Sequence, residues 1–526
     1  LAGYAQIYAL NKDEKTAHEI KGILKAWIRE NPFMKTANWI DSLEVSLRLL
    51  SLSWVYFLTK RSEAMDMYFE ELFLRDIYLH AIFVENNLSS YSSANNHLIG
   101  EAAGLFAAGA FFPQLKGSDR WIKKARAILE REMNAQVYPD GVDKEQSSHY
   151  HEFVTDLYLT VFIIARKNNI MFSNDMLLRI EKMTEFLMNI TDRNGRALSI
   201  GDNDGGSVFK LNISDDSTNT DSLLNTAGVL FKRGDFKRDR SNIDGKSVWL
   251  LGQEGYAKYS SLERRGTRLE SKGFSYGGYY IMRHEELLIS FDCGVLGYLS
   301  LAGHGHADSL SFTLNIGESP VLIDPGTFLY HSGGAWRDYF RSTAGHNTIR
   351  IDKLDQSEIE GPFLWGYKAR SFLKYWSPNG GIDRVCGYHT GYTRLSDPVI
   401  HSREIALDKL KKEVIINDIV SSKKEHLVEQ FYHLHPDCRV EQLNIRSFKI
   451  INAAGNSHAC SLHMEIDRGF DACILKGSES PIAGWYSDKF GEKQKTITIC
   501  NRAYSKGHKS FVTKIKISNN DKIIKP

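Results

Sequence analysis

Four short clusters of polar residues carry side chains that can do chemistry. Amides and guanidinium groups bind anions, phenols and imidazoles transfer protons, and imidazoles with carboxylates ligate metal ions. Globular packing alone does not require so many polar groups together. The clusters are Ser93-Ala-Asn-Asn-His97, Glu145-Gln-Ser-Ser-His-Tyr-His151, Gly303-His-Gly-His-Ala-Asp308 and Arg337-Asp-Tyr-Phe-Arg-Ser-Thr-Ala-Gly-His-Asn347.

The first two clusters lie at predicted helix starts. Ser or Asn before a helical run is most simply an N-cap, and Ser147 or Ser148 can play this part in the second cluster. A helix start also offers free N–H groups and the positive end of a dipole, which suit a carboxylate. Tyr150 falls in the first turn of the second helix. A tyrosine there is usually a core residue, but its neighbours His149 and His151 favour a chemical role.

The third cluster places His304 and His306 between glycines, in a loop whose backbone can approach a ligand. A pair of ordinary surface histidines is the simpler interpretation. His304 or His306, together with Asp324 and His346, would instead give a nitrogen and oxygen ligand set that suits zinc.

One feature of the sequence argues against this zinc set. A tight turn at 317–320 would pair Asp324 with about Thr313, roughly 23 Å along an extended strand from His306. Either the turn is not tight or the chain bends back after Gly326, and the sequence leaves both arrangements open.

Helical segments must position the first two clusters. Apolar residues recur at intervals of three and four over the first 235 residues or so, as in Trp39, Leu43, Leu47, Leu50 and Trp54. The stretch Ile200-Gly-Asp-Asn-Asp-Gly-Gly206 interrupts this pattern with residues typical of tight turns. The predicted helical segments are 13–30, 63–84, 95–111, 117–136, 148–167, 174–190 and 221–232.

Strands must position the other two clusters. From about residue 247 the period changes to two, as in Leu310, Phe312, Leu314 and Ile316, which alternate with polar residues. The second half is therefore predicted to be antiparallel β-structure with one sheet packed on another. The expected domains are residues 1–240 and 241–526. Further strands are predicted at 279–291, 413–419, 458–466 and 495–499.

Length and composition exclude several classes of protein. The chain has 526 residues, of which 42% are hydrophobic and 25% charged, as in folded globular proteins. Its net charge of +2 does not suggest a nucleic-acid partner, and no apolar run is long enough to span a membrane. All six cysteines follow residue 292 without C-x-x-C spacing, so buried unpaired thiols are expected ahead of disulfides.

Four segments, in chain order, resemble the heparinase II/III family of polysaccharide lyases. They are Asn-Asn-His-Leu-Ile-Gly-Glu (95–101), Glu-Gln-Ser-Ser-His-Tyr-His (145–151), His-Gly-His-Ala-Asp (304–308) and Arg-Ser-Thr-Ala-Gly-His-Asn-Thr (341–348). The resemblance spans most of residues 35–350. It implies an α+β protein in which an incomplete (α/α) toroid precedes an antiparallel β-sandwich, in agreement with the order of helices and strands.

The resemblance also implies an activity, because these enzymes cleave acidic polysaccharides by β-elimination at a uronate. Asn96 would neutralise the uronate carboxylate, and Tyr150 and His304 would transfer the two protons. An ordinary phenol pKa of ~10 makes Tyr150 a better acid than base. Elimination requires that these groups face one another across a trough wide enough for a sugar.

Further residues match family positions. His306, Asp324 and His346 match a zinc set that is credited with holding loops of the cleft, and no organic cofactor is implied. The resemblance also implies a periplasmic or secreted protein, although the chain starts at Leu1 without a recognisable signal peptide. Its subunit number is not predicted. The expected substrate contacts are His97, Trp39, Tyr339 and Arg341.

The polymer and two other functions stay open. Heparan sulfate, hyaluronan, chondroitin, alginate and capsular uronans all carry uronate, and the small net charge favours a polymer with little sulfate. A zinc-dependent hydrolase is one alternative function, although the sequence has no H-E-x-x-H motif. A carbohydrate-binding protein without catalytic activity is the other, with a stacking groove formed by Trp39, Trp336, Tyr339 and Tyr432.

Overall fold

The chain folds into two compact units in the computed structural model, which describes residues 1–91, 94–212, 217–237, 243–264, 269–452 and 460–518. Both units combine separate stretches of sequence. The first, called the helical unit below, contains Leu1–Val137, Glu152–Glu185 and Gly206–Gly266. The second, called the β unit, contains Tyr138–His151, Phe186–Gly205 and Thr267–Pro526.

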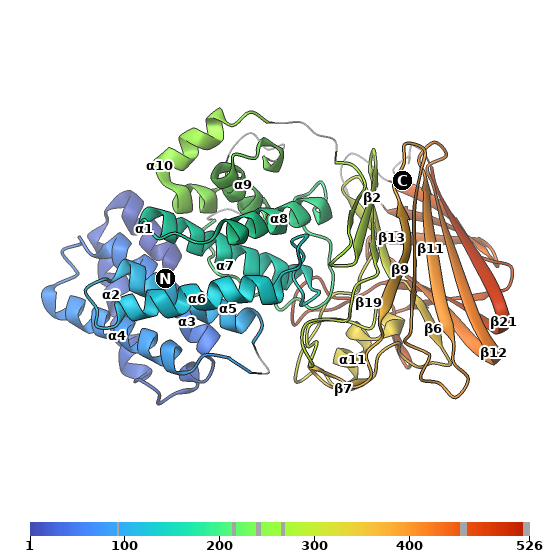
Figure 1. The fold of residues 1–526 in the computed structure, drawn as a ribbon, viewed down its shortest axis with the longest axis horizontal. Coiled ribbons are helices and arrows are strands. Elements are labelled where there is room, and N and C mark those ends of the chain that lie inside the picture. The colour runs from blue at the N-terminus through green and yellow to red at the C-terminus, as the bar shows by residue number, and fades with distance from the viewer. Residues whose placement is uncertain (92–93, 213–216, 238–242, 265–268, 453–459, 519–526) are drawn as a thin grey trace. The chain divides into compact units, whose positions relative to one another are not determined.

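Most helices of the described residues lie close to the segments that apolar periodicity predicted (Figure 1). Ala2–Asn11, Gly245–Ser261 and Ala335–Arg341 were not predicted as helices, and the expectation of strands from about residue 247 is wrong for Gly245–Ser261. Aspartate, threonine or asparagine side chains cap several of the helices by accepting hydrogen bonds from the first turn, as Asp41 does for α3 and Asn95 for α5. The helices are α1 (Ala2–Asn11), α2 (Glu14–Glu30), α3 (Ser42–Thr59), α4 (Met67–Asn86), α5 (Asn96–Phe111), α6 (Ser118–Gln136), α7 (Ser148–Lys167), α8 (Asn174–Ile190), α9 (Asn219–Phe231), α10 (Gly245–Ser261) and α11 (Ala335–Arg341).

The small residues of α5 allow it to lie directly against α3. A Cβ atom on Gly104 would come within 2.0 Å of the Ser46 Oγ, and that hydroxyl donates to the carbonyl of Gly100 at 2.7 Å. Almost every residue of α5 is buried as a result. This packing fixes the N-terminal end of α5, where Asn96 lies.

Two antiparallel sheets form most of the β unit. One has five strands in the order β1-β2-β3-β4-β5, and the other has ten, in the order β13-β14-β15-β21-β12-β11-β10-β9 with β6 and β16 paired at its side. The five-stranded sheet contains β1 (Lys272–Phe274), β2 (Tyr279–His284), β3 (Leu287–Asp292), β4 (Phe312–Ile316) and β5 (Ser319–Leu322).

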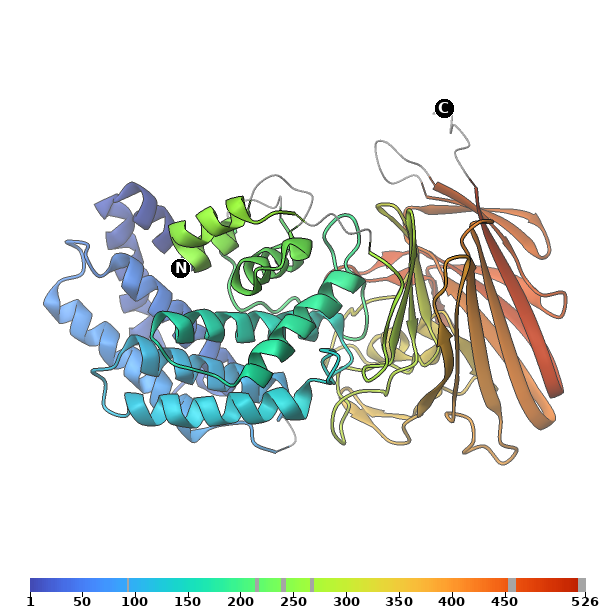
Figure 2. The same cartoon turned by 45° about the horizontal axis from the view of Figure 1, so that its top comes forward.

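The larger sheet includes two long strands, β12 and β21, which lie side by side over most of their length (Figures 1 and 2). Its strands are β6 (Ile349–Ile351), β9 (Ser371–Ser377), β10 (Ile382–His389), β11 (Ile400–Asp408), β12 (Glu413–His433), β13 (Cys438–Asn444), β14 (Ser447–Asn452), β15 (Cys460–Glu465), β16 (Asp471–Lys476) and β21 (Ile497–Ser518). Short pairs are β7 (Ile359–Gly361) with β8 (Leu364–Trp365), β17 (Ser478–Glu479) with β18 (Ile482–Ala483), and β19 (Trp485–Tyr486) with β20 (Gln494–Lys495).

One apolar core joins the two sheets. Ile289 and Phe312 of the smaller sheet belong to the same buried cluster as Val414 and Phe511 of the larger one. The predicted packing of sheet on sheet is therefore confirmed. The order of helices before strands is confirmed as well.

The division into units differs in detail from a single boundary near residue 240. Helix α10 extends the helical unit beyond that point, and two stretches of the first half belong to the β unit. They do so because they bond to its loops: the Asp202 N–H donates to the His304 carbonyl at 3.0 Å, and Asp140 accepts from the Tyr276 N–H at 2.7 Å.

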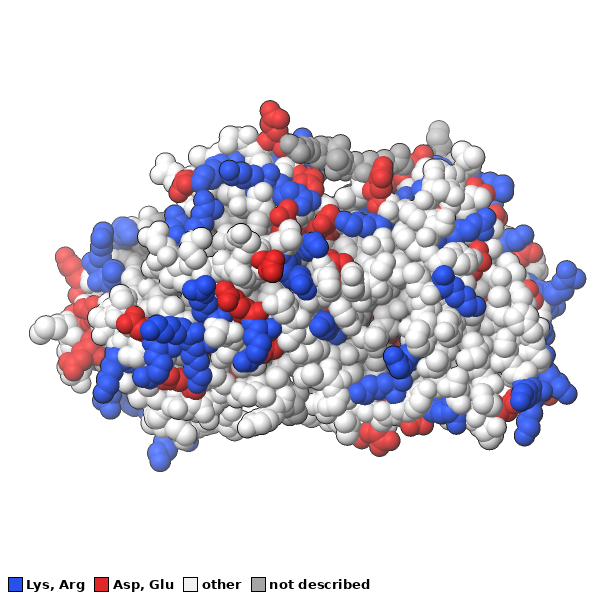
Figure 3. Space-filling model, viewed as in Figure 1, with Lys and Arg blue, Asp and Glu red and all other residues white. Residues whose placement is uncertain are grey.

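The distribution of surface charge agrees with the small net charge of the sequence, and the helices agree with its lack of a long apolar run. Lys and Arg side chains are interspersed with Asp and Glu on the face drawn in Figure 3. Among the described residues, no helix has the length and apolar character needed to cross a membrane.

Candidate active site and metal centre

Three chain segments cross at one point of the β unit, and their crossing positions two of the predicted site residues, Tyr150 and His304. Ser147 accepts from the Tyr150 N–H at 3.2 Å, as a cap of α7, and donates to the Asp202 carbonyl at 2.6 Å. Gly201 has a φ of +63°, and a Cβ atom there would lie 2.5 Å from the Gln146 carbonyl oxygen and 2.8 Å from that of His304. Only glycine suits this crossing.

Tyr150 and His304 meet at this crossing. Their ring centroids are 3.9 Å apart, with the planes inclined by 31°. The Tyr150 hydroxyl lies 3.1 Å from an Asp204 carboxylate oxygen and 3.0 Å from the Tyr330 hydroxyl. The structure thus brings together the two groups that the sequence predicts for proton transfer.

The surroundings keep Tyr150 protonated. Burial, the neighbouring Tyr330 and the carboxylate of Asp204 all raise the pKa of the Tyr150 phenol well above its ordinary value. The raised pKa makes the side chain a proton donor at neutral pH.

Asp202 fixes the orientation of His304. It is fully buried and receives both terminal nitrogens of the Arg337 guanidinium. Burial alone would raise its pKa, but Arg337, His304 and His306 outweigh that effect and hold the pKa well below the usual range. The His304 Nδ1 lies 3.3 Å from this carboxylate, and its Nε2 lies 3.7 Å from a Glu145 carboxylate oxygen. The shorter contact favours the proton on Nδ1 and leaves Nε2 as the basic nitrogen.

The loop before β4 explains how the predicted metal ligands come together. The turn at Gly317 is tight, as the pairing of Ile316 with Ser319 shows. The chain before β4 is not extended, however: Leu310 has a φ of +62°, and the Ser311 N–H donates back to the Asp308 carbonyl at 2.8 Å. The estimate of ~23 Å assumed an extended strand from His306, and this coiled loop makes that assumption wrong.

The metal-type cluster consists of His306, Asp308, Asp324 and His346, whose ligand atoms all lie within 4.8 Å of one another. Three of the four match the predicted set. Asp308 was missed, although it lies two residues after His306 in the same motif. The Asn347 side chain donates hydrogen bonds to the carbonyls of Phe312 and Ile323, and it thereby connects the segments that carry His346 and Asp324.

The orientation of the two imidazoles fits a bound cation. The His346 Nδ1 lies 2.7 Å from the Ser342 carbonyl, and the His306 Nε2 lies 3.1 Å from Asp202, so both of these nitrogens carry protons. The remaining nitrogens, His306 Nδ1 and His346 Nε2, then direct lone pairs at each other over 3.1 Å. A proton or a metal ion between them removes this repulsion.

Nearby carboxylates reinforce the attraction for positive charge. Burial disfavours the imidazolium form, but Asp324 and Asp308 outweigh it and raise the pKa of His346 to about 9. Asp324 lies 3.2 Å from the His346 Nε2. The residues present therefore fit a divalent cation, for which two imidazoles and two carboxylates are suitable ligands.

Three predicted residues belong to the helical unit. Asn96 is the first residue of α5 and is buried, directly after the capping residue Asn95. His97 lies 3.7 Å from Asp41. Trp39 is buried against neighbouring aromatic rings, including that of His80 at 4.5 Å.

The predicted contacts Tyr339 and Arg341 are buried on α11. The Arg341 guanidinium donates to the carbonyls of Gly361 and Pro362 and lies over the Trp365 ring, 4.7 Å from its centroid. Burial lowers its pKa to about 10. In this conformation Arg341 bonds to the backbone of Gly361 and Pro362. Its role as a substrate contact stays a prediction.

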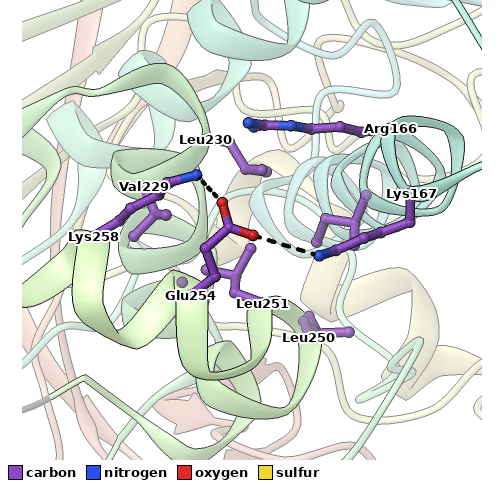
Figure 4. Close-up of a pocket in the computed structure, with 10 residues that line it drawn as sticks. Arg166, Lys167, Val229, Leu230, Leu250, Leu251, Glu254 and Lys258 are labelled. Atoms are coloured by element: carbon purple, nitrogen blue, oxygen red, sulfur yellow. Dashed lines mark hydrogen bonds and ion pairs between the residues drawn. The ribbon is translucent and has the colours of Figure 1, made fainter. Parts of the chain in front are cut away.

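A cavity in the helical unit, of about 240 Å³, contains none of the predicted site residues. Its walls come from α7, α9 and α10, and Glu254 at its edge pairs with Lys167 and Lys258 (Figure 4).

Family models match most of the chain. Residues 2–207 match the Heparinase II/III N-terminus, and residues 266–518 match the model named Heparinase II/III-like, C-terminal. The chain belongs to the heparinase II/III family. The resemblance inferred from the four polar motifs is thereby confirmed.

Two curated relatives are about one quarter identical to this chain over the aligned residues. A heparin-sulfate lyase of Bacteroides stercoris is 26% identical over 454 residues, covering 79% of this chain and 60% of the relative. One of Bacteroides thetaiotaomicron is 25% identical over 404 residues, covering 72% and 54%. The chain thus spans between half and two thirds of the length of these relatives.

Solved structures support the fold. Heparinase III superposes with a TM-score of 0.74 at 20% identity, covering 98% of this chain and 76% of that one. A heparan sulfate lyase of Pedobacter heparinus gives a TM-score of 0.66 at 19% identity, covering 99% and 75%. The α+β architecture expected for the heparinase II/III family is confirmed.

The site also contains residues to which the sequence assigned no role. Asp202 and Asp204 come from the Gly-Asp-Asn-Asp-Gly stretch, which the sequence marked only as a turn. Two acids among glycines between predicted helices were the available signal. Arg337 stood in the fourth polar cluster without an assigned role, and Tyr330 gave no local signal, because only the fold brings it to Tyr150.

Proposed function

We propose that this chain is a polysaccharide lyase that cleaves a uronate-containing acidic polysaccharide by β-elimination, in the periplasm or outside the cell. The observation that carries the proposal is the contact between Tyr150, held as a phenol, and His304, held with Nε2 as its basic nitrogen. Membership of the heparinase II/III family supports it, as do relatives named heparin-sulfate lyases.

His304 acts as the base in this proposal. Elimination begins with removal of the proton on carbon 5, next to the uronate carboxylate, and Nε2 accepts it. The imidazolium that forms lies against the Asp202 carboxylate, which stabilises its charge. Burial disfavours a charged His304, but Asp202 and Glu145 outweigh this and raise its pKa.

Tyr150 acts as the acid. The bond from carbon 4 to the bridging oxygen breaks as the double bond forms, and the departing oxygen needs a proton. The Tyr150 hydroxyl supplies it when the sugar oxygen replaces Asp204 as its acceptor. Tyr330 then lies beside the phenolate oxygen and can donate a hydrogen bond to it.

Asn96 is proposed to bind the uronate carboxylate. Removal of a proton beside a carboxylate requires that its growing negative charge be stabilised, and one amide donor in a site of low dielectric contributes on the order of 3 kcal/mol. The start of α5 adds N–H groups of its own.

The metal-type cluster is proposed to hold zinc with His306, Asp324 and His346, joined by Asp308. A bound ion there supplies fixed positive charge that stabilises the coiled loop before β4. The protein residues themselves move the protons, since His304 and Tyr150 lie outside the four ligands.

A panel of acidic polysaccharides tests this function. Purified protein is incubated with heparan sulfate, hyaluronan, chondroitin, alginate and a capsular uronan. The double bond that elimination forms is followed by its absorbance in the near ultraviolet. We expect this absorbance to increase with a polymer of low sulfate content, because the net charge of this chain is only +2 and does not favour a densely sulfated polymer. Shortened product without this absorbance would indicate hydrolysis, and binding without turnover would indicate a carbohydrate-binding protein.

A stacking groove gains no support from the four aromatic residues considered for the binding protein. Trp39, Tyr339 and Tyr432 are buried, and Trp336 packs on Trp485 at 5.2 Å. Stacking on a sugar requires an exposed ring face.

A further inference from the structure

Two cysteines lie directly opposite each other on neighbouring strands of the larger sheet. In the antiparallel pairing of β16 with β21, Cys473 is the register partner of Cys500. Cα atoms of such partners are about 4.5–5.5 Å apart, which lies within the range of Cα separations that a disulfide spans. All six cysteines are free in the structure, with Cys473 half-buried and Cys500 buried.

The segment between these two cysteines rests on the candidate active site. We call residues 477–496 the strap. The Ser487 N–H donates to the Pro325 carbonyl at 2.9 Å, and the Gly491 N–H donates to the Phe328 carbonyl at 2.7 Å. The Phe490 ring lies 4.9 Å from that of Tyr330. The strap thus supports the loop that carries Tyr330 to Tyr150.

The charges around the pair make the accessible sulfur the reactive one. A hydrogen bond from Cys500 and the positive charge of Arg502 lower the pKa of Cys473. The same pairing and burial raise the pKa of Cys500. Thiolate therefore forms on Cys473, the half-buried partner that a reagent can reach, while Cys500 stays protonated.

We propose that Cys473 and Cys500 form a reversible disulfide that closes the base of the strap. The Cys473 thiolate attacks a low-molecular-weight disulfide, forms a mixed disulfide and releases one thiol. Cys500 then loses its proton and attacks the Cys473 sulfur, which releases the second thiol. Two protein thiols are oxidised, one reagent disulfide is reduced to two thiols, and the protein loses two hydrogens.

The bond has a mechanical consequence for the strap. Strand β16 pairs with β21 and with no other described strand. In the reduced protein this pairing is the strand contact that holds the start of the strap to the sheet, among the described residues. A covalent link between the two strands reduces local opening of the strap, since it removes conformations in which β16 has separated.

Oxidised glutathione tests the bond on the full chain. The protein is incubated with the reagent, quenched by alkylation under denaturing conditions, digested with trypsin and analysed by mass spectrometry. Cleavage after Arg468, Lys476, Lys495 and Arg502 leaves the two cysteines in separate peptides with one cysteine each. We expect these peptides to be joined, and to separate on reduction. Alkylation of both cysteines, a glutathione adduct that persists on Cys473, or pairing with another cysteine would overturn the proposal.

Two variants and one further measurement sharpen the test. Cys473→Ser should abolish the joined peptides and leave Cys500 alkylated, whereas Cys293→Ser, a buried cysteine elsewhere in the β unit, should leave them intact. Hydrogen exchange of residues 477–496 should be slower in the oxidised than in the reduced protein, and equal exchange would contradict the closing of the strap. None of these measurements needs a substrate, so they stand apart from any failure of the proposed lyase activity.

Discussion

The rings of Tyr150 and His304 are in contact, with centroids 3.9 Å apart, although the two residues are 154 positions apart in the sequence. The contact forms because the start of α7, the turn at Gly201 and the loop before β4 bond to one another. An acid and a base therefore share one wall in the β unit. The sequence pattern had instead predicted that Tyr150 belongs to a helical domain of residues 1–240.

Tyr150→Phe should abolish most turnover while the ring stays in place. Loss of a general acid lowers kcat by about 10²–10⁴-fold. Binding of the polymer should change little, since the hydroxyl acts on the departing oxygen. Initial rates in the near ultraviolet and a binding isotherm separate the two effects. Tyr158→Phe, which removes a buried hydroxyl that bonds to the Leu129 carbonyl, is the matched control and should retain activity.

Gly201→Ala should disrupt the crossing that positions the site. Its Cβ would collide with two carbonyl oxygens, and its φ is positive. We expect a loss of about 1–3 kcal/mol in the free energy of unfolding, together with reduced kcat. Gly205→Ala also has a positive φ but no atom within 4 Å of the added Cβ. Denaturant unfolding of both variants checks this, and equal destabilisation would refute the steric account.

Removal of the metal should destabilise the protein. If the cluster binds zinc, a chelator should lower the Tm, because an ion at 1,000 times its Kd stabilises the folded state by about 4 kcal/mol. His346→Ala should show the low Tm without chelator and contain less metal by elemental analysis. His508→Ala serves as control, because it replaces an imidazole on β21 that is not part of the cluster. Equal metal content in the two variants would place the ion elsewhere.

Asp202→Asn should affect both folding and catalysis. The amide keeps the shape but leaves the buried Arg337 guanidinium without its ionic partner, and breaking such a pair costs about 3–5 kcal/mol. It also removes the charge that stabilises protonated His304. We expect a lower Tm and a lower kcat, with the activity loss exceeding the unfolded fraction at the assay temperature. Retention of full kcat in the folded variant would show that Asp202 has only a structural role.

His426 should make stability depend on pH through contacts with residues outside the candidate site. Its ring lies between Asp352 at 2.6 Å and Asp397 at 3.0 Å. Burial lowers its pKa, but the two carboxylates outweigh that and raise it above its usual value. A raised pKa stabilises the folded state below the unfolded value of about 6.5, and this contribution is lost as pH rises through the folded pKa.

His426→Gln should remove this contribution. The Tm difference between the parent protein and the variant should be largest at low pH and should shrink as the solution becomes alkaline. Thermal unfolding across neutral pH measures it. A difference that does not change with pH would mean that the His426 contacts act through shape rather than charge.

Local signals in the sequence were sufficient to predict many of the helices and strands and part of the candidate site. Apolar periodicity placed α7 and β4 within a few residues of their observed bounds, and Ser147 caps α7 as expected. The ligands His306, Asp324 and His346 were grouped by residue type and motif. The coiled loop that unites them was not predicted, because the positive φ of Leu310 has no signal in that residue type.

Long-range pairing accounts for what the sequence could not reveal. Tyr330 reaches Tyr150, and Arg337 reaches Asp202, across more than one hundred positions each, and no local pattern tells which partner either residue will meet. Cys473 and Cys500 belong to the same class: their opposition depends on the register of β16 against β21.

The double attachment of Asp202 has a consequence for anyone who redesigns this protein. One carboxylate bonds to His304 and to His306, for which we propose different tasks, proton transfer and metal binding. Replacement of the proposed ion, or of one of its ligands, should therefore alter the basicity of His304 through Asp202. Metal selectivity and turnover should then change together, and a library that varies one of them should be screened for the other.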